Sequence, residues 1–492
     1  MWPTFSASAP SRPDAGMPQF LDVPPGVVRD VASYIYHAAP YPNETIATVA
    51  AVGFVAAIVG RSHNVSGTGL NQYLLTVAPT GTGKEQGPDG IGRLLAPLEA
   101  AFPALSEIRG PGEIVSAPGL HKALAIRRNP SMLCIIGEAG LMLAQLASPK
   151  RDTNKAGIER FMLHVYTKSG FGAVLDDAAY SDKQNNPGVV NSPALSIVGD
   201  TTPETFYSAL DRRMILSGLL PRFTIFETTA PRPYQNKDRV FAPCPHLIER
   251  LKRLSQIALE LQGSKRVCEV GMTEDAAVTF DQFEHWTTDK VNDAANELTR
   301  HLWTRVYLKA LKLAALNAVG VDPLSPRITY AESMWATNVI VDQTNALIAK
   351  FDSGEIGEAA GNELLQQDRV RMVMRECAQR PFDEIKGQFG GTPEMHGYGL
   401  VTHQYLQRRL LNLPLFKDDP IKATPALKRT IQSLCDNAEI EVLSGPKAKT
   451  TFGHGFLSYR FAEYNPNNEV ERAKNAVFFV PNVGGVLQGN MK

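Results

Sequence analysis

Short apolar runs and longer runs with helical spacing alternate through the first half of the chain. The runs of strand length are "YLLTVAP" (73–79), "SMLCIIGEAG" (131–140), "ALSIVGD" (194–200) and "GLLPRFTIFE" (218–227). Segments such as "GIGRLLAPLEAAF" lie between them and repeat apolar residues every three or four positions. Strands that alternate with helices are typical of a mainly parallel sheet. We therefore predict an α/β unit over residues 71–230.

The residues before this unit are predicted to be helical after a short arm. Residues 1–24 are rich in Pro, Ser and Ala, and we expect a flexible N-terminal arm there. Residues 25–70 contain two helical patterns and are expected to form an N-terminal helical region. The second pattern, the alanine-rich run at 45–60, is too short to span a bilayer and predicts a buried helix. We expect no contact with a membrane.

Beyond the α/β unit the pattern changes three times. "APRPYQNKDRVFAPCP" (230–245) is proline-rich and polar, which predicts a domain boundary. Residues 246–379 have helical spacing throughout and are expected to form a helical lid or bundle. Residues 380–463 are expected to form a further domain, and residues 464–492 an extended C-terminal tail.

The domain at 380–463 shows the element order of a winged helix. Two helical patterns come first, the second being "TPALKRTIQSLCDN", with Thr424 as N-cap and Pro425 in the first turn. The run "EIEVLS", a basic glycine-rich turn "GPKAKTTFGHG" and the run "FLSYRFAE" follow. Helix, helix, strand, wing and strand predict a winged-helix domain.

Composition and charge restrict the classes of protein that this chain can belong to. Of its 492 residues, 43% are hydrophobic and 20% are charged, as in globular proteins. Fifty basic residues balance fifty acidic ones, so a nucleic-acid surface would have to be local. The five cysteines form no CxxC or CxH pair, which argues against a zinc site and a disulfide framework and suits a reducing cytoplasm.

The strand at 73–79 runs into a glycine-rich loop, and a helical pattern follows. This context, together with the spacing of the loop's glycines and lysine, predicts a phosphate-binding loop. The glycines let the backbone N–H groups approach phosphate oxygens, and the lysine reaches the β and γ phosphates. The predicted nucleotide contacts of the loop are Ala78, Pro79, Thr80, Gly81, Thr82, Gly83, Lys84 and Glu85.

A nucleotide site of this kind also needs an acid, and here the usual metal ligands are replaced. Glu138 follows the strand at 131–136 and is predicted to act as the general base. Gly137 stands where an aspartate would help to position Mg²⁺, and Glu85 stands where a Ser or Thr hydroxyl is usual. Carboxylate oxygens suit Mg²⁺. Glu85 and Glu138 are therefore the predicted metal ligands.

The order of these motifs resembles a known family. "LNQYLLTVAPTGTGKE", "SAPGLHKAL", "SMLCIIGEAG", "FMLHVYTKSG", "NSPALSIVGDTTPETF" and "GLLPRFTIFE" together are similar to the helicase-like P-loop ATPases of prophages, plasmids and mobile islands. Those are primase-associated domains of unknown function, related to superfamily 3 helicases of the AAA+ class. The resemblance spans about residues 25 to 350. It implies an AAA+/RecA-like P-loop core that binds ATP and Mg²⁺.

The resemblance also implies roles for single residues. Lys84 would bind phosphate, Glu138 would activate water, and Asp200 or Thr201 would lie near the γ-phosphate. Arg222 would be an arginine finger that acts across a subunit interface; a structural salt bridge is its alternative. The rival fingers are Arg212 and Arg213.

DNA contacts are predicted in two places. The resemblance implies a hairpin before the sensor strand, here "AVLDD" and "GVV" around the polar tip "SDKQNNPG", with Lys183 as the tip residue that tracks DNA in a central pore. In the winged helix, basic residues of the second helix and the wing would contact phosphates; docking to a protein is the alternative. These residues are Lys428, Arg429, Lys447 and Lys449.

We expect an ATP-dependent DNA helicase or translocase that acts in the replication of a phage, plasmid or mobile genetic element. It would act as a homo-oligomeric ring on single-stranded or forked DNA, with a primase or another replisome protein as a possible partner. One alternative is a replication initiator that uses ATP as an assembly switch, with weak or no hydrolysis. Another is a P-loop remodeller such as a helicase loader.

Overall fold

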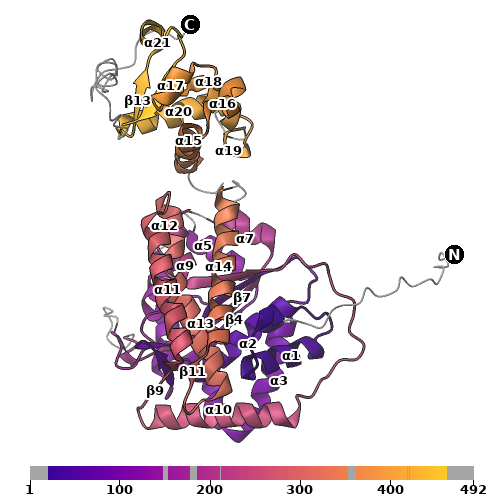
Figure 1. Ribbon diagram of the computed structural model, residues 1–492. Helices are drawn as coiled ribbons and strands as arrows, with labels where there is room; N and C mark the ends of the chain where they lie inside the picture. Colours follow the sequence, from indigo (N-terminus) through magenta and orange to yellow (C-terminus); the bar gives the residue numbers. More distant parts are fainter. Residues whose placement is uncertain are drawn as a thin grey trace, which may run out of the picture. The chain divides into compact units, whose positions relative to one another are not determined.

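The computed structural model describes residues 20–147, 153–177, 186–210, 212–352, 362–417, 419 and 422–462 (Figure 1). Its contacts divide the chain into two compact units, Met1–Asp352 and Ser353–Lys492. None of the described helices is both long enough and apolar enough to cross a bilayer. Each unit is described by itself.

The first unit is built on a four-stranded parallel sheet. Its strands are β3 (Tyr73–Val77), β4 (Ser131–Ile136), β7 (Ala194–Thr201) and β8 (Phe223–Glu227), and their order across the sheet is β4-β7-β3-β8. All neighbouring pairs are parallel. Nearly every residue of these strands is buried, because helices cover both faces of the sheet. The prediction of a mainly parallel α/β unit is confirmed.

One face of the sheet is covered by α2 (Glu44–Val59). This helix is the predicted alanine-rich one, and its residues from Ile46 to Val59 are buried, so that prediction is confirmed. A side chain at Gly53 would overlap the Val198 side chain, which shows how closely α2 approaches β7. Outside α2 lie α1 (Val27–Ala38), α3 (Gln86–Ala101) and α13 (Val306–Val321), which share its hydrophobic core.

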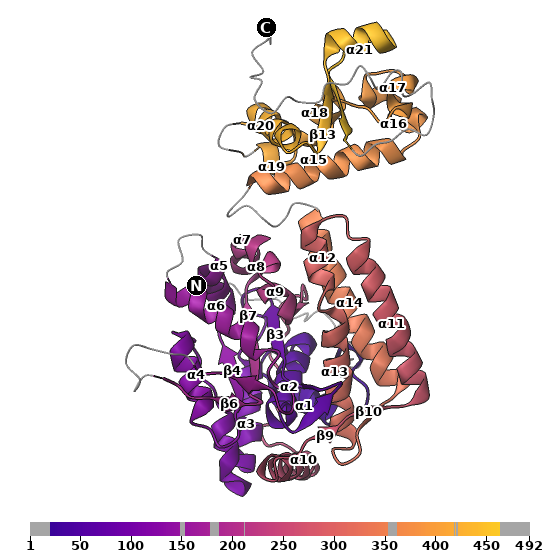
Figure 2. The ribbon, with the colours of Figure 1, turned by 90° about the vertical axis from the view of Figure 1, so that its left-hand side faces the viewer.

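Helices that follow β4 and β7 lie on the opposite face of the sheet, whereas α3, which follows β3, lies on the face of α2 (Figure 2). Gly199 of β7 points to the face opposite α2, where its neighbour is Ala139 at the start of α5. The helices after α3 and before β8 are α4 (Ala117–Ala125), α5 (Ala139–Ala147), α6 (Thr153–Val165), α7 (Pro203–Ala209), α8 (Arg212–Leu216) and α9 (Leu219–Arg222), with a 3-10 helix at Pro103–Ile108. A further 3-10 helix, Phe20–Asp22, precedes α1 and packs on α2.

The helical region after the sheet belongs to the same unit. The segment between β8 and α10, which the sequence predicted as a boundary, packs along α1: Val240 N–H donates to His37 O at 3.1 Å, and Tyr34 Oη donates to Phe241 O at 2.7 Å. The elements of this region are α10 (Pro245–Gly263), α11 (Glu274–Asn292), α12 (Glu297–Trp303), α13, α14 (Tyr330–Asp352) and the short strands β9 (Cys268–Glu269), β10 (Gly271–Met272) and β11 (Arg327–Ile328). β9 pairs with β1 (His63–Val65), which also pairs with β2 (Thr68–Gly69).

The hairpin that the sequence predicted before β7 forms. β5 (Val174–Leu175) pairs antiparallel with β6 (Val190–Asn191). Lys183 at its tip lies outside the described residues.

The second unit surrounds a three-stranded antiparallel sheet of order β12-β14-β13. Its described elements are α15 (Asn362–Gln379), α16 (Phe382–Phe389), α17 (Pro393–Gly397), β12 (Val401–Thr402), α18 (His403–Leu410), α19 (Pro414–Lys417), α20 (Ala423–Asp436), β13 (Ile440–Leu443), α21 (Gly445–Phe452) and β14 (Ser458–Phe461). The division between the units therefore falls at 352/353 and not at 379/380, because α15 packs with the second unit.

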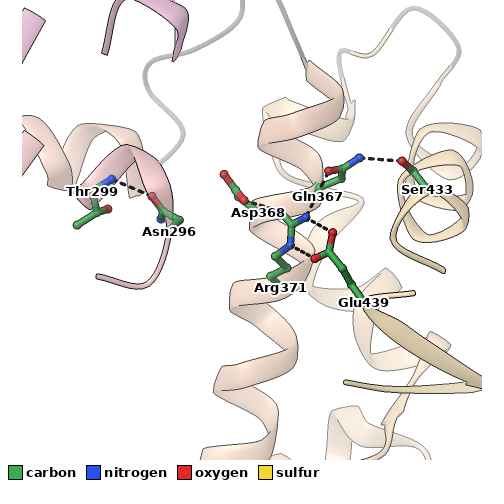
Figure 3. A network of polar contacts seen from close by, with 7 residues as sticks. All are labelled: Asn296, Thr299, Gln367, Asp368, Arg371, Ser433 and Glu439. Atoms are coloured by element: carbon green, nitrogen blue, oxygen red, sulfur yellow. Dashed lines mark hydrogen bonds and ion pairs between the residues drawn. The ribbon is translucent and has the colours of Figure 1, made fainter. Parts of the chain in front are cut away.

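Polar contacts fix α15 in this unit (Figure 3). Arg371 binds both carboxylate oxygens of Glu439, each at 2.8 Å, and also Asp368 at 2.6 Å. Gln367 donates to Ser433 Oγ of α20 at 2.9 Å. The bidentate contact with Arg371 lowers the pKa of the Glu439 carboxyl. These contacts join α15 to α20 and to the start of β13.

Two local predictions in the second unit are wrong. The expected basic turn "GPKAKTTFGHG" contains helix α21, because Pro446 occupies the first turn and Gly453, with φ 73°, ends the helix. The side chains of Ala448 and Phe452 are buried in the hydrophobic core of the second unit. Thr424 is not an N-cap either, because α20 begins at Ala423.

Candidate functional site

The glycine-rich loop at 78–85 lies at the carboxyl edge of the parallel sheet. It follows β3, and α3 begins directly after it at Gln86. Ala78 N–H donates to Thr201 O of β7 at 3.0 Å, and Thr228 N–H donates to Val77 O at 3.0 Å. The loop is thus anchored between two neighbouring strands. In open parallel sheets, ligands bind at this edge.

The loop glycines are required by the backbone. Gly81 and Gly83 have φ values of 82° and 87°, in the left-handed region that favours glycine. A side chain at Gly83 would also overlap the carbonyl oxygen of Tyr41. Thr82 turns inward, and its hydroxyl donates to Pro79 O at 2.7 Å. The conformation therefore depends on both glycines.

Gln86 connects the loop to the start of α2. Its Nε2 donates to Gly83 O at 3.1 Å, and its Oε1 accepts the N–H of Asn43 at 3.2 Å. Asn43 in turn caps α2 by accepting the N–H of Ile46 at 3.1 Å. Sequence analysis missed this role, although a Gln two positions after the lysine and an Asn before a helix were both visible.

Lys84 faces two carboxylates from distant parts of the chain. Its Nζ lies 4.0 Å from Glu138 Oε1 and 3.8 Å from Asp200 Oδ1. The Lys84 side chain is only 13% exposed, whereas that of Glu138 is 53% exposed. The structure therefore brings together three residues that the sequence predicted separately. A lysine beside two acids at a glycine-rich loop is an arrangement able to bind a phosphate–metal complex.

Asp200 lies in the middle of this group. Burial raises the pKa of its carboxyl; the positive charge of Lys84 opposes this effect, and the negative charges of Glu138 and Glu85 add to it. The backbone of Glu138 lowers this pKa. Thr201, the other predicted sensor residue, is fully buried next to Gly140. Of the two, Asp200 is the one that faces Lys84.

Glu138 has an unusual backbone conformation. Its φ is 52°, which is uncommon for a residue with a side chain and occurs at functional sites. The turn continues directly into α5, where Leu141 N–H donates to Glu138 O at 2.9 Å. At Gly137 an added side chain would meet no atom within 4 Å. The turn thus presents the Glu138 carboxylate and leaves open space beside it.

An arginine that sequence analysis missed also lies at the loop. Arg232 follows β8, and its guanidinium lies over the Tyr41 ring, 4.4 Å from the ring centroid. A side chain at Gly81 would come within 3.5 Å of Arg232 Nη1. Within the described residues, no carboxylate lies within ion-pair distance of this guanidinium. Its position in a proline-rich segment favoured a linker, so no sequence signal pointed to this cation.

Arg222 lies at the opposite edge of the sheet. Phe223, the next residue, pairs with Tyr73 at the start of β3, roughly 13 Å along the strand from the loop. Its Nη1 donates to Gly218 O at 2.7 Å, and its Nε is buried without a partner among the described residues. Arg222 and Lys84 of one chain therefore do not meet. The side chains of Arg212 and Arg213 lie outside the described part.

The predicted DNA contacts of the second unit lie on two helices. On α20, Lys428 is exposed, whereas Arg429 pairs with the buried Asp419 at 3.1 Å. On α21, Lys449 is exposed and Lys447 is partly buried. Lys428 and Lys449 are thus the two of the four that present a free surface, and Arg429 has a structural contact.

The acidic residues fit the requirements of Mg²⁺ with a nucleotide. Among the described residues, no three His, Cys, Asp or Glu side chains gather closely enough to hold a metal ion by themselves. Mg²⁺ at nucleotide sites uses only one or two carboxylates and takes its other oxygen ligands from phosphates and water. Asp200 and Glu138 beside Lys84 offer such a donor set.

Comparison with models of known protein families gives no match for this sequence, and comparison with curated proteins gives none either. The chemistry of the residues at the loop is therefore the basis for a function.

Proposed function

We propose that the first unit is a P-loop ATPase core of the AAA+/RecA-like type, and that the protein is an ATP-dependent DNA helicase or translocase. One observation carries the proposal: Lys84, Glu138 and Asp200 converge beside a glycine-rich loop at the carboxyl edge of a parallel sheet. The strand that leads into this loop is central, and the strand that leads to Glu138 lies two places away.

Each residue then has a chemical role. The N–H groups of the loop and Lys84 bind the β and γ phosphates of ATP. Glu138 accepts a proton from the attacking water. The water oxygen forms a bond to the γ-phosphorus, and the bond between the γ-phosphorus and the β–γ bridging oxygen breaks. The products are ADP and phosphate. When bound, Mg²⁺ neutralises charge on the phosphate oxygens.

The second unit supports the DNA part of the proposal. Its helices and three-stranded antiparallel sheet are compatible with a winged helix in which α20 is the second predicted helix and α21 replaces an extended wing. Lys428 and Lys449 would contact DNA phosphates. In this proposal the protein forms a ring in the cytoplasm, Arg222 acts on the site of a neighbouring subunit, and a primase is a partner in replication of a phage, plasmid or mobile element.

One observation favours the alternative of an ATP-switched initiator or loader. The residue before Glu138 is Gly137, and the residue after Lys84 is Glu85, so neither usual metal ligand is present. A site that holds Mg²⁺ weakly would bind ATP but turn it over slowly. The two functions differ in turnover and in strand separation.

Steady-state and single-turnover ATPase assays on the full-length protein test the proposal. Lys84→Ala should abolish ATP binding, and Glu138→Gln should keep binding while slowing hydrolysis by about 10²-fold or more. Lys122→Ala and Glu113→Gln, both exposed positions of the same unit, are the matched controls and should behave as wild type. ATPase activity that survives both Lys84→Ala and Glu138→Gln would overturn the assigned site. Turnover without unwinding of forked DNA would favour the loader.

A further inference from the structure

The site lacks both usual protein ligands of Mg²⁺, and the structure points to a substitute. This inference depends on the proposed nucleotide site. Gly137 has no side chain, and Glu85 is an exposed residue that directly precedes α3. If the phosphates bind at the loop, the metal needs a carboxylate at the same edge of the sheet.

The strand register identifies that carboxylate. Ile136 of β4 pairs with Gly199 of β7, so the next residues along the two parallel strands, Gly137 and Asp200, lie side by side. Thr76 of β3 pairs with Asp200 on the other side. Asp200 therefore lies between the strand that leads into the glycine-rich loop and the strand that leads to Glu138. Gly137, which follows β4, has no carboxylate, but Asp200 supplies one from β7, the strand between β4 and β3.

The surroundings of Asp200 suit a metal ligand better than a structural acid. Its Oδ1 lies 3.8 Å from Lys84 Nζ, which is too far for a hydrogen bond and leaves the lysine able to turn to a phosphate. The side chain is 21% exposed, so it can be reached by a ligand bound at the loop.

We propose that Asp200, from β7, supplies the carboxylate that holds the Mg²⁺ of the bound nucleotide, in place of residue 137 on β4. Glu85 is the rival ligand. The space beside Gly137 is open, because a Cβ at this position would meet no atom within 4 Å. The proposal can therefore be tested by removing the carboxylate at 200 and introducing one at 137.

The experiment is calorimetric titration of the full-length protein with a non-hydrolysable ATP analogue, in excess Mg²⁺ and in EDTA. The measured quantity is the ratio of the two dissociation constants. We expect Mg²⁺ to tighten binding by about tenfold or more in wild type, and Asp200→Asn to reduce that ratio to near one. Because Asn removes a negative charge near the triphosphate, binding in EDTA should be preserved or improved. A merely structural role of Asp200 would weaken binding in both conditions.

Three further variants make the result decisive. Glu85→Gln should keep the wild-type ratio, and Asp200→Glu should keep a ratio above one. Gly137→Asp combined with Asp200→Asn should restore the Mg²⁺ effect. A full Mg²⁺ effect in Asp200→Asn, or its loss in Glu85→Gln, would overturn the inference.

If Asp200→Asn does not fold, the double variant Gly137→Asp with Asp200→Ser is used in its place. If this double variant folds and Mg²⁺ does not tighten its binding of the analogue, the result counts against the inference. Failure of the proposed function gives a different result. In that case wild type would bind no nucleotide in either condition, or Lys84→Ala would bind as wild type does.

Discussion

At the residue scale, Gly83 is the position where the loop tolerates least change. Gly83→Ala would place a methyl group against the Tyr41 carbonyl oxygen in a backbone with φ 87°, so the loop must move. We expect a loss of about 1–3 kcal/mol in the free energy of unfolding and weaker nucleotide binding. Urea unfolding and nucleotide titration measure the two effects.

Gly92 provides the matched control. It lies within α3, and a side chain there would meet no atom within 4 Å. Gly92→Ala should therefore leave nucleotide binding unchanged and stabilise the protein by about 0.5–1 kcal/mol. Equal losses of binding in the two variants would contradict the role given to the loop conformation.

Lys312 links stability to pH. It is fully buried, its Nζ donates to Asn71 Oδ1 at 2.6 Å, and burial lowers its pKa to about 7. In the unfolded chain the pKa is near 10.5, so between pH 7 and 10 the unfolded state binds more protons. The free energy of unfolding should therefore rise with pH in this window, by up to about 1.4 kcal/mol per pH unit from this lysine.

The neighbours of Lys312 define the control. Its Nζ lies 4.5 Å from the centroid of the Tyr166 ring, and Lys309 precedes it by one turn on α13. Burial lowers the pKa of Lys309 to about 8, so it adds to the same trend, whereas Tyr166, with a pKa of about 12, stays neutral below pH 10. Unfolding curves at pH 7, 8 and 9 should show a smaller slope for Lys312→Met. An unchanged slope would refute the assignment.

At the scale of elements, the strands were predictable and the register was not. β3, β4, β7 and β8 are buried parallel strands, which produce continuous apolar runs in a sequence. The side-by-side positions of Gly137 and Asp200 depend on pairing between segments 63 residues apart, which no local pattern encodes. Arg232 and Tyr41 reach the loop from two further segments, one after it and one before it in the sequence. Lys84, Glu138 and Asp200 were therefore each named from the sequence, but their convergence and the positions of Arg232 and Tyr41 were not.

Helix α21 illustrates a local error. The glycines at the two ends of "GPKAKTTFGHG" favoured a turn, yet Pro446 in the first turn and Gly453 just past the last turn are also the usual limits of a short helix. Burial of Ala448 and Phe452 in the core decides between the two. Tertiary packing, which the sequence pattern does not contain, determined the outcome.

On α20, the second predicted helix, Arg429 has a structural contact, whereas its neighbour Lys428 is exposed at the surface. Arg429 pairs with Asp419, whose side chain is 1% exposed, so Arg429→Ala would leave a buried carboxylate without this partner. We expect a loss of roughly 1–3 kcal/mol in the stability of the second unit. Lys428→Ala should leave stability unchanged and weaken DNA binding, most strongly at low salt. Urea unfolding and DNA binding at two salt concentrations check both. Unchanged DNA binding in Lys428→Ala would favour a protein-docking role.

At the scale of the whole molecule, the two units have separate hydrophobic cores. Among the described residues, the large core of the first unit extends from Phe20 to Ile340, and the core of the second from Val370 to Tyr459. A fragment of residues 1–352 contains all residues of the proposed nucleotide site. We therefore expect it to fold alone and to bind the ATP analogue within about threefold of the full-length affinity. Calorimetric titration measures this.

The cut site decides whether the second unit survives alone. A fragment of residues 353–492 retains α15, with the contacts of Arg371 to Glu439 and of Gln367 to Ser433. A fragment that begins at 380, where the sequence pattern placed the boundary, loses these contacts and leaves the core without Val370, Val373 and Met374. Burying such side chains stabilises a domain by about 1.5–3 kcal/mol each, which is a large part of the stability of a small domain. Circular dichroism should therefore show a cooperative thermal transition for 353–492 and none for 380–492. Cooperative unfolding of the shorter fragment would place α15 outside the folding unit.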